Sequence, residues 1–235
     1  MAAPPAIAQA QDDPWEPLNR RIFVVNDAVD RRVFRPVAKG YDRITPRPVR
    51  RGIGNVFENL RTPATALNQF LQGKPREGVS DVSRFLLNTT VGLAGFFDVA
   101  SRSGLAKHEE DFGQTFRTWG VGSGPFMMVP FLGPATTTHA VGMVFDAFTN
   151  PLILVSPRRD QLALVAVDLI DTRADLLAVD QLISEDADRY LFIRDAYLQR
   201  RQYLISDGQV DDDPFLDDWD DDWDDDDDYD ADSEE

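Results

Sequence analysis

The feature of this sequence that most restricts its fold is a long segment without charge. From Thr118 to Phe145 there is no Asp, Glu, Lys or Arg, and between Thr118 and Pro157 the only charged residue is Asp146. Its core, Trp119 to Pro134 (WGVGSGPFMMVPFLGP), contains three prolines. A transmembrane helix needs about 20 apolar residues, and each proline removes a helix hydrogen bond. The segment is therefore long enough to enter a membrane but too broken to cross it as one helix, and a buried hairpin in a soluble core remains an equal alternative.

Two shorter uncharged segments precede it, Thr62 to Gly73 and Phe85 to Phe97. Segments of this length are usually buried helices or interfacial segments, because they are too short to span a bilayer. Their recurrence favours a helical bundle with one side in lipid or in a large core.

Apolar residues spaced by three and four positions indicate helices through most of the chain. We find no alternating runs typical of strands, so we expect an all-α fold. Pro36 is expected to end the first helix, Thr62 and Pro63 to begin the third, and Asp111 and Ser184 to cap two later ones. The expected helices cover about residues 14–34, 46–61, 62–73, 112–119, 135–148, 159–180 and 185–205.

The acidic residues are unevenly distributed. The chain of 235 residues has a formal net charge of −17, yet residues 211–235 hold 17 of the 41 acidic residues and no Lys or Arg. Residues 1–210 are balanced, with 24 acidic and 24 basic side chains, which argues against a nucleic-acid surface built on clustered Lys and Arg. Such an acidic, aromatic-containing tail does not fold alone; it is usually solvated but can dock on a basic partner.

The sequence predicts three parts. Residues 1–12 end near Ala8-Gln9-Ala10, a triplet of the kind that precedes signal cleavage, but a basic start and an apolar core are missing. We interpret this part as a truncated signal or a disordered leader. Residues 13–208 form the helical domain, and residues 209–235 form an acidic disordered tail.

No pattern in the sequence is specific for catalysis. There is no cysteine, and neither His108 nor His139 belongs to an H-E-x-x-H zinc motif. Ser123 does not complete G-x-S-x-G, because Val121 stands where the first glycine should be. We therefore expect no catalytic residue, no metal site and no cofactor in a protein that is not an enzyme.

Three glycines precede the apolar part of the long uncharged segment. Gly120, Gly122 and Gly124 can adopt positive φ values and resist being fixed in a helix, so they make a plausible hinge before an apolar hairpin. The adjacent Met127 and Met128 have flexible side chains that adapt to irregular apolar surroundings, either lipid or core.

Many ordered motifs resemble the MlaA (VacJ) family, and the resemblance covers about residues 13–208. The motifs include Asp13-Pro14-Trp15-Glu16, Asn19-Arg20, Asn26, Asp30, Arg35-Pro36-Val37-Ala38, Asn68, Leu71-Gln72-Gly73, Asn88, Glu110-Asp111-Phe112-Gly113-Gln114-Thr115, Trp119-Gly120-Val121-Gly122, Gly124-Pro125, Pro130, Asp171-Thr172-Arg173 and Arg194-Asp195-Ala196-Tyr197-Leu198-Gln199-Arg200.

The resemblance implies a phospholipid transport protein of the outer membrane. The family looks like a helical ring in the inner leaflet, with amphipathic helices in the membrane plane and a central channel. Mislocalised phospholipids leave the outer leaflet through this channel and pass to a periplasmic carrier, MlaC, beside trimeric porins, so lipid asymmetry is maintained.

The same resemblance implies the functional positions. The hinge and gating hairpin are Gly120, Gly122, Gly124, Pro125, Phe126, Met127, Met128, Val129, Pro130, Phe131 and Leu132. Positions near the channel or the ring core are Asn19, Asn26, Asn68 and Asn88.

The sequence departs from the family pattern in three places. No lipidated cysteine is present, Thr138-His139 replaces an Arg-Asp pair, and the acidic tail lies beyond the family core. A soluble periplasmic interaction protein with a closed core is the main alternative, and a phospholipase is a third.

Overall fold

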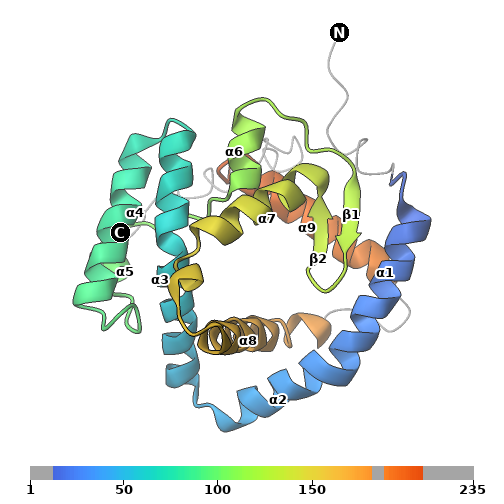
Figure 1. The fold of residues 1–235 in the computed structure, drawn as a ribbon, viewed down its shortest axis with the longest axis horizontal. Helices are drawn as coiled ribbons and strands as arrows, with labels where there is room; N and C mark the ends of the chain where they lie inside the picture. Colours follow the sequence, from blue (N-terminus) through green and yellow to red (C-terminus); the bar gives the residue numbers. More distant parts are fainter. Residues whose placement is uncertain (1–12, 182–187, 209–235) are drawn as a thin grey trace, which may run out of the picture.

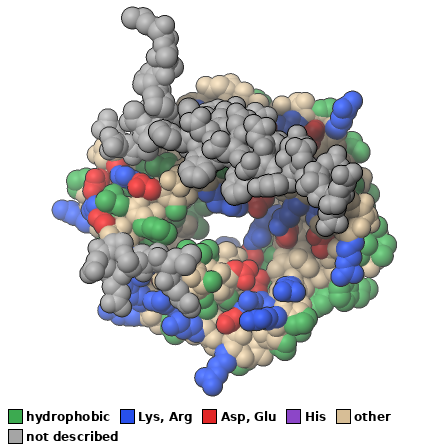
Figure 2. All heavy atoms as spheres, turned by 180° about the vertical axis from the view of Figure 1, so that it is seen from behind, with side chains coloured by type: hydrophobic (Ala, Val, Ile, Leu, Met, Phe, Trp, Pro, Cys, Tyr) green, Lys and Arg blue, Asp and Glu red, His purple; other side chains and the backbone are tan. Residues whose placement is uncertain are grey.

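The computed structural model describes residues 13–181 and 188–208, which form a ring of helices (Figure 1). The helices α1, α2, α3, α7 and α8 surround a central opening, and a two-stranded hairpin lies at its rim. Seen from behind with all atoms drawn, the opening passes through the molecule (Figure 2). The expected all-α ring with an apolar hairpin is confirmed, and the leader and tail lie outside the described residues.

The ring begins with one long helix in three parts: α1 (Glu16–Val29), the π-helical turn η2 (Asp30–Phe34) and α2 (Arg35–Ile44). The prediction that Pro36 ends this helix is wrong. In η2 the backbone N–H of Arg35 bonds the carbonyl of Asp30, five residues earlier. A π turn shifts the hydrogen-bond ladder locally and so accommodates a proline that an α-helix interior would not accept.

The next helix, α3 (Arg47–Leu71), continues through Pro63, so the prediction of a separate helix beginning at Thr62 is also wrong. The hydroxyl of Thr62 donates to the carbonyl of Glu58 at 3.1 Å instead of capping a new helix. α3 packs against α4 (Pro75–Thr90), its main partner (Figure 1). This packing outweighs the local cost of one proline.

The remaining elements complete the ring. They are α5 (Val99–Arg102), α6 (Phe112–Thr118), β1 (Phe126–Val129), β2 (Gly133–Thr136), α7 (Thr137–Thr149), η3 (Pro151–Leu154), α8 (Arg158–Asp175), η4 (Val179–Gln181) and α9 (Arg189–Ile205). As predicted, Asp111 caps α6, accepting from the N–H of Gln114 at 2.8 Å. Asp188 caps α9, whereas the expected cap Ser184 lies outside the described residues. α8 ends earlier than predicted, and Asp180 beyond it bonds Arg173 at 2.7 Å.

Side chains in this ring are distributed unusually for a globular domain. The largest fully buried side chains are mostly polar, and they include Gln69, Asn19 and Asn68. Large apolar side chains are exposed on many helices, including Leu162, Val165 and Leu169 of α8. Contiguous exposed apolar surface marks contact with a membrane or a partner. Among the described helices, none has both the length and the hydropathy of a membrane span.

Candidate functional site: a hairpin clamped inside the ring

The hairpin is short and antiparallel. β1 and β2 pair from Phe126 opposite Thr136 to Val129 opposite Gly133. Phe131 in its turn has φ +64°, and Gly133 at the start of β2 has φ +92°. The tip residues Phe131 and Leu132 are each 66% exposed. An isolated two-stranded hairpin is marginally stable at best, so the rest of the ring must hold this one in place.

Asn19 of α1 binds the outer edge of β1. Its side-chain amide donates to the carbonyl of Phe126 at 3.2 Å, and its Oδ1 accepts from the N–H of Met128 at 2.8 Å. The side chain is 1% exposed. One asparagine thus satisfies both backbone groups that a neighbouring strand would otherwise satisfy.

Asn26 repeats this arrangement two helical turns later. It donates to the carbonyl of Val129 at 3.0 Å and accepts from the N–H of Phe131 at 2.9 Å. Seven residues of α-helix rise about 10.5 Å, and three residues of antiparallel strand extend about 10 Å. The spacing of the two asparagines along α1 therefore matches the spacing of the backbone groups along the hairpin.

The inner side of the hairpin packs on α9. Phe126 and Met128 form a buried cluster with Tyr190. The hydroxyl of Tyr197 accepts from the N–H of Thr136 at 2.9 Å and lies 2.8 Å from Nδ1 of His139. Burial lowers the pKa of His139, which favours the neutral ring. His139, at one of the positions that depart from the family pattern, thus takes part in holding the base of the hairpin.

The three glycines differ in conformation. Gly120 has φ +89° and ends α6 with two hydrogen bonds, from its own N–H to Arg117 and from the N–H of Val121 to Phe116. This pattern is a Schellman motif, which favours glycine. Gly124 has φ +67°, and a Cβ there would lie 2.8 Å from the Cβ of Thr137. Gly122 has an ordinary φ, and a Cβ on it would meet no atom within 4 Å, although its carbonyl accepts from the hydroxyl of Thr138. Its hinge role remains a prediction.

The hairpin is also anchored through the contact between α6 and α7. These helices approach closely, because a Cβ on Gly142 would lie 2.3 Å from the backbone nitrogen of Gly113. Burial raises the pKa of Asp146 on α7 to about 6, although the N–H of Phe112 donates to its Oδ1 at 3.1 Å.

Two arginines connect distant parts of the ring. Arg201 of α9 binds Asp111 through both Nη atoms, one of them at 2.7 Å, and these bonds outweigh burial and lower the pKa of Asp111. Arg173 of α8 binds Asp30 of η2 at 2.6 and 2.9 Å. A planar guanidinium suits such paired bonds to a carboxylate. These contacts link α9 to α6 and α8 to the π turn.

The other two predicted asparagines, Asn68 and Asn88, bond residues outside the hairpin. The Oδ1 of Asn68 accepts from the hydroxyl of buried Thr115 at 2.7 Å. The Oδ1 of Asn88 accepts from the N–H of Ala100 at 2.9 Å, and its amide donates to Asp98 at 3.1 Å. Burial would raise the pKa of Asp98, but hydrogen bonds, first from Ser101, lower it to about 2. Neither asparagine hydrogen-bonds to the hairpin, whereas Asn19 and Asn26 do.

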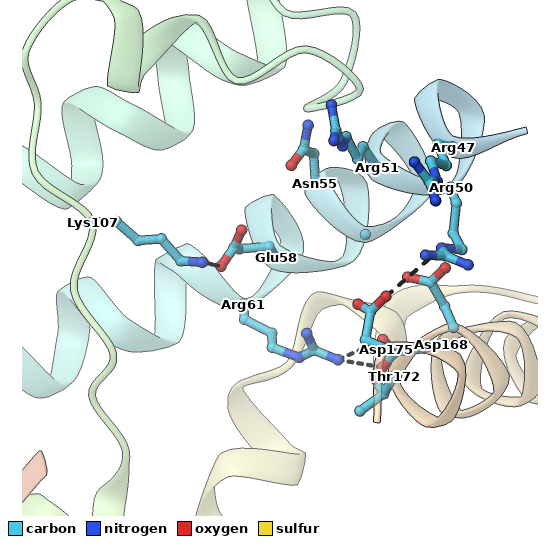
Figure 3. Close-up of a pocket in the computed structure, with 12 residues that line it drawn as sticks. Arg47, Arg50, Arg51, Asn55, Glu58, Arg61, Lys107, Asp168, Thr172 and Asp175 are labelled. Atoms are coloured by element: carbon cyan, nitrogen blue, oxygen red, sulfur yellow. Dashed lines mark hydrogen bonds and ion pairs between the residues drawn. The ribbon is translucent and has the colours of Figure 1, made fainter. Parts of the chain in front are cut away.

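A polar cleft of about 610 Å³ lies between α3 and α8 (Figure 3). Arg47, Arg50 and Arg51 occupy one end and Lys107 the other, as Figure 3 shows. The sequence analysis did not predict this cleft, because its two walls come from helices far apart in the chain, α3 and α8. Among residues 13–181 and 188–208, no three His, Cys, Asp or Glu side chains are grouped to hold a metal ion.

Comparisons with known proteins agree on one family. The family model described as MlaA lipoprotein matches residues 11–204. The intermembrane phospholipid transport system lipoprotein MlaA of Escherichia coli is 35% identical over 206 residues, which cover 86% of this chain and 82% of that protein. Its namesake from Haemophilus influenzae is 30% identical over 204 residues, covering 85% of this chain and 82% of that protein.

A solved structure agrees with these sequence relatives. It was reported under the words "Structural basis for maintenance of bacterial outer membrane lipid asymmetry". It superimposes with a TM-score of 0.73 at 36% identity, covering 83% of this chain and all of that chain.

Proposed function

Because this chain belongs to the MlaA lipoprotein family, we propose that it transports phospholipids at the outer membrane and so maintains lipid asymmetry. Its relatives are named as parts of an intermembrane phospholipid transport system. The family is a transport family, and the proposed activity moves lipid without breaking a covalent bond.

We propose that lipid moves through the central opening of the ring. The observation that carries this proposal is the opening itself, with charged side chains near its rim, inside a ring whose helices expose apolar side chains (Figure 2). Apolar helix faces suit acyl chains, and a polar passage suits a phosphate-containing headgroup. Both parts of a phospholipid therefore find a matching surface on the same ring.

The hairpin at the rim is the proposed gate. Its strands are fixed by Asn19 and Asn26, whereas its tip exposes Phe131 and Leu132. Gly122 is the proposed hinge, because it lies between α6 and the hairpin and a Cβ on it would meet no atom within 4 Å. In this proposal the protein lies at the periplasmic side of the outer membrane, passes lipid to an MlaC-like carrier and sits beside a trimeric porin.

The test is lipid transfer from reconstituted bilayers to a soluble carrier. The protein would be inserted in vesicles containing a fluorescent phospholipid, and the rate of transfer to the carrier would be compared for wild type and Gly122→Leu. A bulky side chain at the hinge is expected to change the rate by at least about threefold, as hinge substitutions alter gated steps.

Gly40→Leu is the matched control. A Cβ at Gly40 would also meet nothing within 4 Å, but this glycine lies on α2, outside the hairpin. Equal rates for both variants and wild type would remove the hinge from the proposal. Wild-type protein that transfers no lipid would contradict the transport function, and release of fatty acid from labelled phospholipid would contradict the non-enzymatic reaction.

A further inference from the structure

The polar cleft between α3 and α8 contains cations that the ring does not neutralise. Within the described ranges, Arg47 and Arg51 have no carboxylate within ion-pair distance, and both are exposed. Each of the other three cations that line the cleft has a carboxylate partner: Arg50 with Asp42 and Asp175, Arg61 with Asp168, and Lys107 with Glu58. The two cations without a partner, Arg47 and Arg51, therefore lie at the end of the cleft formed by the first turns of α3.

All these α3 side chains lie on one face of the helix. Arg47, Arg51 and Glu58 are spaced by four and seven residues, which places them in one row along α3. Arg43 at the end of α2 precedes this row and also has no carboxylate partner among the described residues. The face thus presents exposed guanidinium groups beside a hollow, a surface that favours a chain of carboxylates.

The described part of the chain ends close to the other end of this cleft. Lys74 contacts both Asp207 and Glu110, the latter at 3.1 Å. Arg200 of α9 holds Glu109 at 2.6 Å. Lys107 is only three residues from Glu110, a separation of at most about 11 Å along the backbone. The described chain therefore ends, after α9, beside the loop of Lys107 and Glu110, and Lys107 lines the cleft.

The residues that follow are the most acidic in the sequence, with 17 Asp and Glu and no Lys or Arg in residues 211–235. We propose that this acidic segment binds the cleft of its own chain at the end that carries Arg47 and Arg51, with its carboxylates on these two arginines. Fourteen residue steps lead from Gly208 to Asp222, and an extended chain of this length spans about 46 Å. Tethering supplies an effective concentration in the millimolar range, which an untethered anionic ligand must exceed.

The test uses the absence of cysteine from the sequence. In full-length protein in nonionic detergent, Thr172→Cys in the cleft wall and Asp222→Cys in the segment would be joined by a short bis-maleimide. The matched pair places the first cysteine at exposed Ala147 on α7, which does not line the cleft. At about 10 mM salt the cleft pair is expected to react about tenfold faster, and the advantage should vanish near 1 M salt, where the Debye length is about 3 Å.

Charge variants distinguish specific binding from proximity. Arg47→Glu with Arg51→Glu should abolish the advantage, whereas Arg76→Glu with Arg102→Glu, two exposed arginines outside the cleft, should preserve it. Replacing Asp217, Asp218, Asp220 and Asp221 by Asn leaves the ring unaltered and should also abolish it. Equal rates for the cleft and control pairs at low salt would overturn the proposal. So would an advantage that survives either the Arg47 and Arg51 reversal or the neutralised segment.

Discussion

Asn19 and Asn26 show how single side chains can replace a whole strand. β1 has one strand partner, and its other edge faces α1, whose own backbone groups are occupied within the helix. An asparagine offers a donor and an acceptor on one planar group, so it can bond a carbonyl and an N–H of the same strand. The position of the hairpin therefore depends on two side chains with defined hydrogen-bond partners.

Replacing Asn19 by Ala is expected to lower the free energy of unfolding by about 2–4 kcal/mol, because it leaves a buried carbonyl and a buried N–H without partners. Asn26→Ala should cost less, since its site is only partly buried. Denaturant unfolding in detergent, followed by circular dichroism, would measure both. A loss for Asn19→Ala no larger than that for Asn26→Ala would contradict the burial argument.

Asp146 gives a pH-dependent expectation. Its pKa is about 6 in the folded protein, against an ordinary value of 3.8, so the folded state holds the proton more tightly. Stability contributed by the protonated form is present below about pH 4 and is lost as the pH rises through about 6. Asp146→Asn keeps an acceptor for Phe112 and should raise Tm at pH 7.5 but not at pH 4. An equal gain in Tm at both pH values would contradict the ionisation of Asp146 as its cause.

At the scale of elements, the linker after α6 contains one glycine that the fold requires, Gly120, and one that is the proposed hinge, Gly122. Gly120→Ala is expected to cost about 1 kcal/mol, because alanine disfavours the left-handed conformation that ends α6. Gly122→Ala should leave the free energy of unfolding within about 0.5 kcal/mol, since its φ is ordinary and a Cβ there would meet no atom within 4 Å. Thermal unfolding of the two variants would measure this difference, and a larger loss at Gly122 would show that it is structurally constrained.

The elements that the sequence predicted well are those determined locally. The prediction that Asp111 caps a helix was correct because capping depends on neighbouring residues. The hairpin was predicted from prolines and glycines around an apolar run. Pro36 and Pro63 misled because the π turn and the packing of α3 on α4 come from the assembled fold. The spacing of apolar residues along the sequence predicts neither the π turn nor this packing.

At the scale of the whole molecule, the candidate site depends on long-range contacts that a single sequence does not display. Arg173 bonds Asp30 across 143 residues, and Asn19 bonds Met128 across 109. The family resemblance included all four residues but did not pair them. Their pairing follows only once the chain is closed into a ring, which places α1 beside the hairpin.

The exposed apolar side chains of α8 lead to a membrane prediction. Replacing Leu162, Val165 and Leu169 by Gln should leave the helical content unchanged, because these side chains are exposed, but should weaken flotation with phospholipid vesicles. Arg158→Gln with Arg159→Gln alters the same helix without removing apolar area and serves as control. Flotation unchanged in the triple variant would mean that α8 does not contact lipid.

The contacts of α9 set the order in which the ring can be completed during synthesis. Tyr190 bonds Asp13 across 177 residues, and Arg201 bonds Asp111 across 90. While the chain still lacks these residues, the hairpin has no Tyr190 or Tyr197 to pack against. The longest uncharged segment of a nascent chain therefore cannot complete its packing until α9, the last helix of the described residues, has been made. During this interval, aggregation or binding by a chaperone would compete with folding.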